Sequence, residues 1–231
     1  PFTLFALFPT LLKKTSRGGS WMNKIKVTLG FLELAFALKF FSVADLSYGW
    51  RLLDRETFLA LWIALFALVP SFFLGIASLA FAIYMIPGLW GAPTKAVSAF
   101  APPMSTQDFN LDVVKVEAKF TDYEKGMAYA RQTGKPVLLD FTGFGCVNCR
   151  KMETAVWRDA RVRDLINKDY VLISLYVDDK TALPAPIEVE ENGKITTLRT
   201  VGDRWSYLQR NKFGANAQPF YIALDGEGQP L

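Results

Sequence analysis

Two cysteines, Cys146 and Cys149, are the residues of this 231-residue chain best suited to chemistry, and they stand two residues apart in "FTGFGCVNCRKME". They follow the apolar run "PVLLDF", which is typical of a buried strand, and "CRKMETAVW" after them is typical of a helix. This order places the first sulfur at a helix N-terminus, where free N–H groups and the helix dipole stabilise a thiolate. The second cysteine lies one turn inside the helix and can attack a mixed disulfide formed by the first. The pattern predicts a two-cysteine redox centre.

Metal binding and a purely structural disulfide are the two alternatives for this pair. A structural zinc site needs four ligands, and the sequence has no histidine and no third cysteine. A disulfide that closes so short a loop removes little chain entropy. We therefore favour redox chemistry and expect a redox-active disulfide between Cys146 and Cys149, with no bound metal and no other bound cofactor.

The distribution of apolar residues divides the chain into a membrane part and a soluble part. Apolar residues are concentrated in residues 1–90, whereas most acidic residues lie beyond position 107. The net charge of +4 does not indicate nucleic-acid binding, because the basic residues form no stripe interleaved with aromatic residues. The chain begins at Pro1 inside an apolar run and ends at "DGEGQPL", a turn that predicts a further strand. We interpret it as an internal piece of a longer protein.

Apolar helices are expected in the membrane part at about 1–12, 25–43, 57–70 and 71–89. The run 25–43 approaches the roughly 20 residues needed to cross a bilayer core. Pro70 interrupts the later apolar run, and proline tends to kink or end a helix. Residues 57–89 could therefore form one kinked helix or two short spans.

Basic residues beside apolar spans mark the cytoplasmic face of a membrane. Here they bracket the loop before the second expected helix: Lys13, Lys14, Arg17, Lys24 and Lys26. With two spans in 57–89 the soluble part lies outside, and with one span it lies in the cytoplasm.

Two charged residues fall within the expected span 25–43. Lys39 is expected to snorkel toward the nearby interface. Glu33 is more central, and a carboxylate inside a membrane is a functional candidate by default. No partner for it can be identified from the sequence, so its role stays open.

Residues 91–110 have the Pro, Ser and Ala content of a linker, and residues 111–231 have the pattern of an α/β domain. The expected order of its elements is strand "VVKVEAKF", helix "YEKGMAYARQT", strand "PVLLDF", helix "CRKMETAVW", helix "DARVRDLINKD", strand "YVLISLYV", a helix at about 202–212 and strand "PFYIALD".

Local signals fix some of the element ends. Thr121 and Glu124 are spaced as a capping box for the first helix of the domain, which Gly134 and Pro136 should end. The pair Asn192–Gly193 predicts a hairpin turn in an inserted segment.

The order strand, Cys-x-x-Cys, helix, strand and then "NAQPFYIALDGEG" resembles the thioredoxin superfamily, with Gln218–Pro219 at the position of its cis-proline. With an apolar part in front, the chain resembles the DsbD family of membrane thiol:disulfide interchange proteins. The stretches "GFLELAFALKF", "FAIYMIPGLWGAP" and "DFTGFGCVNCRKME" resemble the Bacteroidetes-type branch of that family. The resemblance implies a multi-span α-helical membrane region followed by a C-terminally truncated α/β thioredoxin-like domain.

The resemblance also implies a function. In that family, electrons pass from cytoplasmic thioredoxin through a cysteine pair in the membrane domain to the thioredoxin-like module, and then to periplasmic disulfide proteins. The chain would be part of a multi-pass protein of the bacterial inner membrane with its thioredoxin-like domain in the periplasm, in contact with membrane lipid. Its membrane cysteine pair would lie upstream of Pro1. Cytochrome c-type biogenesis is among the processes that such reductases serve.

Site residues follow from the same resemblance. Cys146 would be the attacking thiolate and Cys149 the resolving one, with Asp140 and Glu153 as two carboxylates near the active site. Carboxyl groups buried near a thiol have raised pKa values and can relay its proton. The alternative interpretations are a strand-end residue for Asp140 and a solvated helix face for Glu153.

The resemblance also concerns the substrate groove and one departure from other thioredoxins. Gln218 and Pro219 would bind an extended substrate peptide beside the cysteines. Gly145 stands where many thioredoxins carry tryptophan.

A second functional hypothesis is a tethered thioredoxin-like module that serves cytochrome c maturation or metal delivery without disulfide turnover. Copper carriers of this fold usually add a distal histidine, and the sequence has none. This difference favours the reductase.

Overall fold

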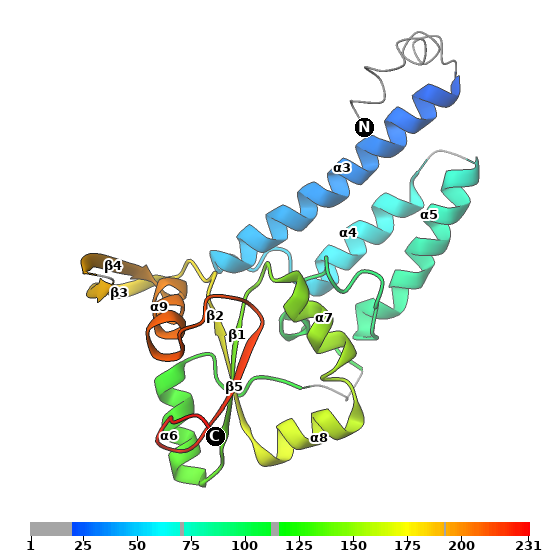
Figure 1. Ribbon diagram of the computed structural model, residues 1–231. Helices are drawn as coiled ribbons and strands as arrows, with labels where there is room; N and C mark the ends of the chain where they lie inside the picture. Colours follow the sequence, from blue (N-terminus) through cyan, green and yellow to red (C-terminus); the bar gives the residue numbers. More distant parts are fainter. Residues whose placement is uncertain (1–19, 70–71, 112–115, 192) are drawn as a thin grey trace, which may run out of the picture.

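The computed structural model describes residues 20–69, 72–111, 116–191 and 193–231, and it has an apolar helical part and an α/β part (Figure 1). The helix expected at about 1–12 lies outside these residues, as do Pro70 and Asn192. The helical part contains α3 (Ser20–Ser47), α4 (Arg55–Ala67) and α5 (Phe72–Met85), and the 3-10 helix η1 (Ile86–Trp90) follows α5.

Helix α3 contains the expected span 25–43 and is the one helix in the described ranges that is long and apolar enough to cross a membrane. Its apolar side chains are largely exposed, as expected for a lipid-facing surface: Val27, Leu29, Leu32, Leu34, Phe36, Phe40 and Phe41. Helix α4 has 13 residues, about 20 Å at 1.5 Å per residue, which is shorter than a bilayer core of about 30 Å.

The apolar run 57–89 forms two separate helices that run antiparallel. Ser78, midway along α5, donates a hydrogen bond of 2.6 Å to the carbonyl of Phe66, late in α4. Leu59, early in α4, lies next to Gly88 beyond the end of α5, because a Cβ on that glycine would be 3.2 Å from its side chain. The chain therefore returns after α5 to the level at which α4 began.

Residues 91–110, expected to be a linker, pack into the helical part. Val97 and Ala101 are fully buried in a cluster with Phe58, Leu59 and Trp62. The short 3-10 helix η2 (Met104–Thr106) follows. Small residues at these positions let an irregular backbone approach aromatic side chains closely, so the same composition that suggested a linker suits a packed segment.

The α/β part is built on a sheet of order β2-β1-β5, as the sequence predicts for a central strand at 137–141. Strand β1 (Val137–Thr142) pairs parallel with β2 (Val171–Tyr176) and antiparallel with β5 (Phe220–Leu224). Figure 1 shows α6 (Tyr123–Thr133) and α9 (Val201–Phe213) on one side of the sheet. Helices α7 (Val147–Ala155) and α8 (Ala160–Asp169) cover the other side.

Alternation along β1 decides which side chains face which helices. Val137, Leu139 and Phe141 are fully buried in the core with residues of α6 and α9. Leu138 packs with the opposite cluster around Trp157. Because successive side chains of a strand point to opposite faces, Asp140 shares the face of Leu138 and is directed to the α7 side.

Two local expectations turn out differently. The N-cap of α6 is Asp122, whose carboxylate accepts the N–H of Lys125 at 2.9 Å, so the capping box predicted from Thr121 and Glu124 is wrong. Glu124 instead pairs with Arg204 at 2.7 Å. Of "VVKVEAKF", the described residues contribute only an isolated bridge between Phe120 and Ile173 in place of a strand.

Two other predictions of local structure are confirmed. Gly134 ends α6 in the left-handed conformation. The inserted segment is a hairpin of β3 (Ala182–Glu191) and β4 (Lys194–Thr200), with Gly193 at a φ of 73° in its turn.

Candidate active site

Cys146 is the N-cap of α7, as the sequence predicts, and it is joined to Cys149 by a disulfide. Its Sγ accepts a hydrogen bond of 3.1 Å from the N–H of Cys149. Cys146 is half-buried, whereas Cys149 is 1% exposed. A partner sulfur can therefore reach Cys146 more readily than Cys149, and the backbone N–H that now contacts Cys146 would stabilise its thiolate after reduction.

The loop before Cys146 is held by Asp178, which follows β2. Its two carboxylate oxygens accept the N–H groups of Phe144 and Gly145, each at 2.9 Å. A Cβ on Gly143 would lie 2.9 Å from this carboxylate, so a side chain at this position would clash with Asp178. The Phe144 ring stacks on Tyr176 with ring centroids 4.2 Å apart. The cysteine loop is thus fastened to the end of β2.

The same loop touches the helical part. A Cβ on Gly145 would lie 3.2 Å from Cγ1 of Val43 in α3. Nearby, the N–H of Lys180 donates a 2.7 Å hydrogen bond to the carbonyl of Ser47 at the end of α3. The position where many thioredoxins have tryptophan carries no side chain here, and this lets α3 approach the cysteine loop.

Lys39 and Glu33 of α3 have different surroundings. Lys39 is 8% exposed and lies within electrostatic range of Arg150 and Asp178, so it is directed at the α/β part and does not snorkel to an interface as expected. Glu33 is exposed on the helix surface.

Asp140 is a buried carboxyl group on β1, 2% exposed. Its Oδ2 accepts a 2.8 Å hydrogen bond from the hydroxyl of Ser174, the residue opposite it on β2. Its Oδ1 accepts none from the described residues. Burial raises the pKa of Asp140 from 3.8 to about 7, with the hydrogen bond from Ser174 opposing and the charge of Glu153 adding to the rise. A carboxyl group with this pKa can exchange protons near neutral pH.

Glu153 lies on α7 with a side chain that is 19% exposed, and its carboxylate pairs with Nη2 of Arg150 at 2.7 Å. Burial raises the pKa of Glu153, while the guanidinium groups of Arg150 and Arg55 lower it. The same Nη2 donates to the hydroxyl of Thr142 at 3.1 Å. Glu153 therefore belongs to a buried charge network that acts on Asp140 through space, and it does not lie on a solvated helix face.

Gln218 lies beside Cys146, and Pro219 follows it in the chain. The peptide bond between them is cis, and Pro219 directly precedes β5, whose first residue Phe220 pairs with Phe141 of β1. Gln218 lines a shallow groove together with Cys146 and Asp178. Its side-chain amide donates a 2.9 Å hydrogen bond to the buried side chain of Gln209, which fixes its orientation.

Comparisons with known proteins agree with this geometry. A family model described as thioredoxin-like matches residues 118–198. The thiol:disulfide interchange protein DsbD of Pseudoalteromonas atlantica is 30% identical over 237 residues, which cover 94% of this chain and 39% of that protein. The chain contains a DsbD-like thioredoxin domain.

A second DsbD protein and a solved structure are also similar to this chain. The DsbD of Vibrio vulnificus strain CMCP6 is 27% identical over 89% of this chain and 34% of its own length, so the chain spans little more than a third of these relatives. Among solved structures, an oxidoreductase called DsbH covers 52% of this chain and 74% of its own, with 16% identity and a TM-score of 0.34. The assignment of the DsbD-like domain rests on the sequence relatives.

Sequence reasoning missed Arg150 and Asp178 in the DsbD-like domain. Arg150 directly follows the second cysteine, and Asp178 follows a buried strand at the edge of the sheet where β1 also ends. The position of Asp178 was a visible signal, because residues at the carboxyl ends of neighbouring parallel strands lie close together. In the described part of the chain, no group of three His, Cys, Asp or Glu residues is placed to hold a metal ion.

Replacing Asp178 with alanine is expected to destabilise the DsbD-like domain by about 2 kcal/mol, because two backbone N–H groups lose a charged acceptor. The midpoint of thermal unfolding of the chain in detergent measures the effect. Asp179→Ala is the matched control, since the Asp179 carboxylate accepts a local hydrogen bond from the N–H of Thr181. Equal destabilisation by the two variants would contradict a special role for Asp178.

Proposed function

We propose that the chain is part of a membrane-anchored protein-disulfide reductase that passes electrons to periplasmic disulfide-bonded proteins through Cys146 and Cys149. The observation that carries this proposal is the pairing of a half-buried Cys146 at the start of α7 with a buried Cys149. The family relationship to thiol:disulfide interchange proteins supports it.

The proposed chemistry begins with both cysteines reduced. The Cys146 thiolate attacks one sulfur of a substrate disulfide, which forms a mixed disulfide and releases the other substrate sulfur as a thiolate that takes up a proton. The Cys149 thiolate then attacks Cys146, which breaks the mixed disulfide, forms the Cys146–Cys149 disulfide and releases the second substrate thiol. The substrate gains two electrons and two protons, and the chain loses two electrons and the protons of its two thiols.

Asp140 is proposed to accept the proton that Cys149 loses as it becomes a thiolate. The carboxyl group lies on the sheet face directed at α7, and its pKa of about 7 matches a group that alternates between the two protonation states. Glu153 is proposed to adjust this pKa, since its charge raises the pKa of Asp140 and Arg150 opposes the effect. Gln218 and Pro219 are proposed to line the substrate groove.

Regeneration requires a dithiol donor outside this chain. We assign that role to a cysteine pair in the membrane domain of the longer protein, which would in turn receive electrons from cytoplasmic thioredoxin. The short distance between the cysteine loop and α3, set by the contact of Gly145 with Val43, supports transfer from the membrane side.

The proposal includes a multi-pass inner-membrane location with the DsbD-like domain in the periplasm. Helix α3 ends beside this domain at Ser47, and the antiparallel pair α4 and α5 returns the chain to the same side. Lys24 and Lys26 stand at the opposite end of α3 and favour the cytoplasm there. The exposed apolar side chains of α3 would contact lipid.

A reporter fused after Thr94 tests this topology. We expect a reporter that needs periplasmic export to be active and one that needs the cytoplasm to be silent. A fusion after Gly19 is the matched control and should give the reverse pattern. Cytoplasmic activity of the Thr94 fusion would overturn the proposed arrangement.

The proposed activity is tested with the chain in detergent after reduction and removal of the reductant. Mixed with a disulfide-bonded protein, it should generate two substrate thiols for each Cys146–Cys149 disulfide formed, as counted by alkylation and mass spectrometry. Chain whose thiols were alkylated beforehand is the control. A reduced chain that transfers no more electrons than this control would exclude a reductase.

A further inference from the structure

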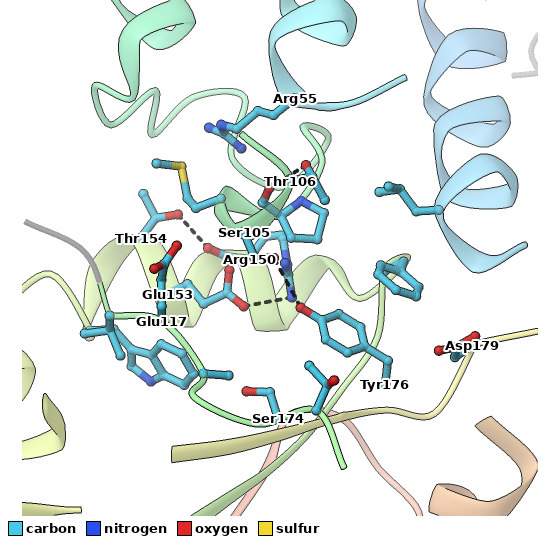
Figure 2. A pocket seen from close by; sticks show the side chains of 18 of the residues that line it. Arg55, Ser105, Thr106, Glu117, Arg150, Glu153, Thr154, Ser174, Tyr176 and Asp179 are labelled. Atoms are coloured by element: carbon cyan, nitrogen blue, oxygen red, sulfur yellow. Dashed lines mark hydrogen bonds and ion pairs between the residues drawn. The ribbon is translucent and has the colours of Figure 1, made fainter. Parts of the chain in front are cut away.

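A cavity of about 530 Å³ lies between the helical part and the DsbD-like domain (Figure 2). Arg55, the first residue of α4, enters it from the helical part, and Arg150 and Glu153 of α7 enter it from the other side. The cavity is distinct from the shallow groove at Cys146, and the two share no lining residue.

Two arginines in this cavity are buried with hydrogen-bond donors left over. Arg55 and Arg150 are each 3% exposed. Arg55 donates from Nη1 to the carbonyl of Pro102 and from Nη2 to the hydroxyl of Thr94. Its Nε finds no acceptor among the described residues, and neither do Nε and Nη1 of Arg150. A buried charged donor without an acceptor is costly, so these groups favour a ligand that accepts hydrogen bonds.

The charges in the cavity favour an anion. Glu153 is the lining carboxylate that acts on both arginines, while Glu56 and Asp140 act on Arg55 and Arg150 from outside the lining. The lining itself carries four arginines against three carboxylates. Glu117 and Arg158 also line the cavity with opposite charges. Asp179 accepts the N–H of Thr181, and Arg51 lies at the rim, where its side chain is 59% exposed and 3.7 Å from Asp54.

Hydroxyl groups add neutral donors beside the arginines. Ser105 and Tyr176 are 3.4 Å apart across the boundary between the two parts, and either can donate to the other. One hydroxyl proton of the pair then remains for a ligand. Arginine forks combined with hydroxyls match tetrahedral oxyanions better than they match cations or apolar groups.

We propose that this cavity binds a phosphate-type oxyanion between Arg55 and Arg150. The bound anion would join α4 to α7 and hold the DsbD-like domain against the helical part. Both inorganic phosphate and the headgroup of an anionic lipid carry this chemistry, and the position of Arg55 at the start of an apolar helix suits either source.

The experiment uses the chain in a maltoside detergent, which contains no phosphate. Inorganic phosphate is titrated in one arm and phosphatidylglycerol in the other, and the midpoint of thermal unfolding is recorded. We expect saturable stabilisation in at least one arm. Stabilisation by phosphate identifies a free anion as sufficient, and stabilisation by the lipid alone identifies a lipid headgroup. Each of these two results supports the site. If neither arm shows saturable stabilisation, the proposal is overturned.

Variants locate the site. Arg55→Gln and Arg150→Gln should each weaken the apparent affinity about tenfold or more, the usual effect of losing a charge-assisted hydrogen bond. Arg51→Gln at the rim is the matched control and should retain the affinity. The proposal would be overturned if Arg55→Gln kept the wild-type affinity. It would also be overturned if Arg51→Gln lost as much affinity as Arg55→Gln.

A direct measurement covers the case in which the buried variants do not fold. Phosphorus NMR of phosphate or phosphatidylglycerol mixed with the wild-type chain should show line broadening that excess unlabelled sulfate reverses. Arg150→Lys, which keeps the charge and loses the planar fork, should reduce the broadening. Absence of reversible broadening by the wild-type chain would contradict the site without any variant.

Discussion

Replacing Cys149 with serine is expected to trap a covalent complex between Cys146 and a disulfide-bonded partner. The serine hydroxyl cannot attack the mixed disulfide, so the second step stops while the first proceeds. Replacing Cys146 with serine should abolish both trapping and electron transfer, because Cys149 is 1% exposed and out of reach of a partner sulfur. The trapped complex is measured by electrophoresis without reductant, followed by mass spectrometry of the linked peptides.

The control for this experiment is Asn148→Ala. Asn148 lies between the two cysteines and is exposed, so the variant alters the loop while keeping both sulfurs, and it should neither trap a partner nor lose activity. The same assignment predicts that the pKa of the Cys146 thiol falls below the free-cysteine value of about 8.5. Alkylation rates of the two single-cysteine variants across a pH series measure this order. A faster-reacting Cys149 would reverse the two roles.

Replacing Asp140 with asparagine is expected to slow the resolving step near neutral pH and to leave the first attack largely intact. Only the ionised carboxylate can accept a proton from Cys149, and its pKa is raised to about 7 by burial. In the wild-type chain, the rate of resolution should therefore rise with pH through about 7, and in Asp140→Asn this rise should be missing. Single-turnover measurements with a pre-formed mixed disulfide separate the two steps. An unchanged pH profile in the variant would remove Asp140 from the proton path.

The same raised pKa has a consequence for stability. Between the usual pKa of 3.8 and about 7, the folded chain keeps a proton on Asp140 that the unfolded chain has lost. The stabilisation is fully present below pH 3.8 and is lost as the pH rises to about 7, by at most about 4 kcal/mol. Asp140→Asn should flatten this part of the stability curve, and Asp169→Asn, at an exposed position, should not. Thermal unfolding of the oxidised chain in detergent at several pH values measures the difference.

Local sequence signals predicted the parts of the site that lie within one continuous stretch. The strand before the cysteines, the position of Cys146 at the start of α7 and the helix and strand that follow are encoded by neighbouring residues. The cap of α6 was misassigned, because Asp122 and Thr121 are adjacent residues that can both act as an N-cap.

Contacts between distant segments could not be predicted from the sequence alone. Asp178 holds a loop more than thirty residues before it, and Arg55 and Arg150 meet at one cavity from separate parts of the chain. Small residues at 91–110 are compatible with both an exposed linker and a packed segment. Tertiary contacts decide whether such a segment is packed or exposed, and local propensity does not predict which of the two occurs.

The close approach of Val43 to Gly145 should leave a trace in related sequences as covariation. A side chain added at position 145 would meet Val43 within 3.2 Å, so the combined volume of the two residues is limited. Homologues with a bulky residue at the position of Gly145 should carry a smaller one at the position of Val43, or should lack the contact with this helix. In engineered chains, tryptophan at position 145 should be tolerated better when Val43 is replaced with glycine in the same molecule.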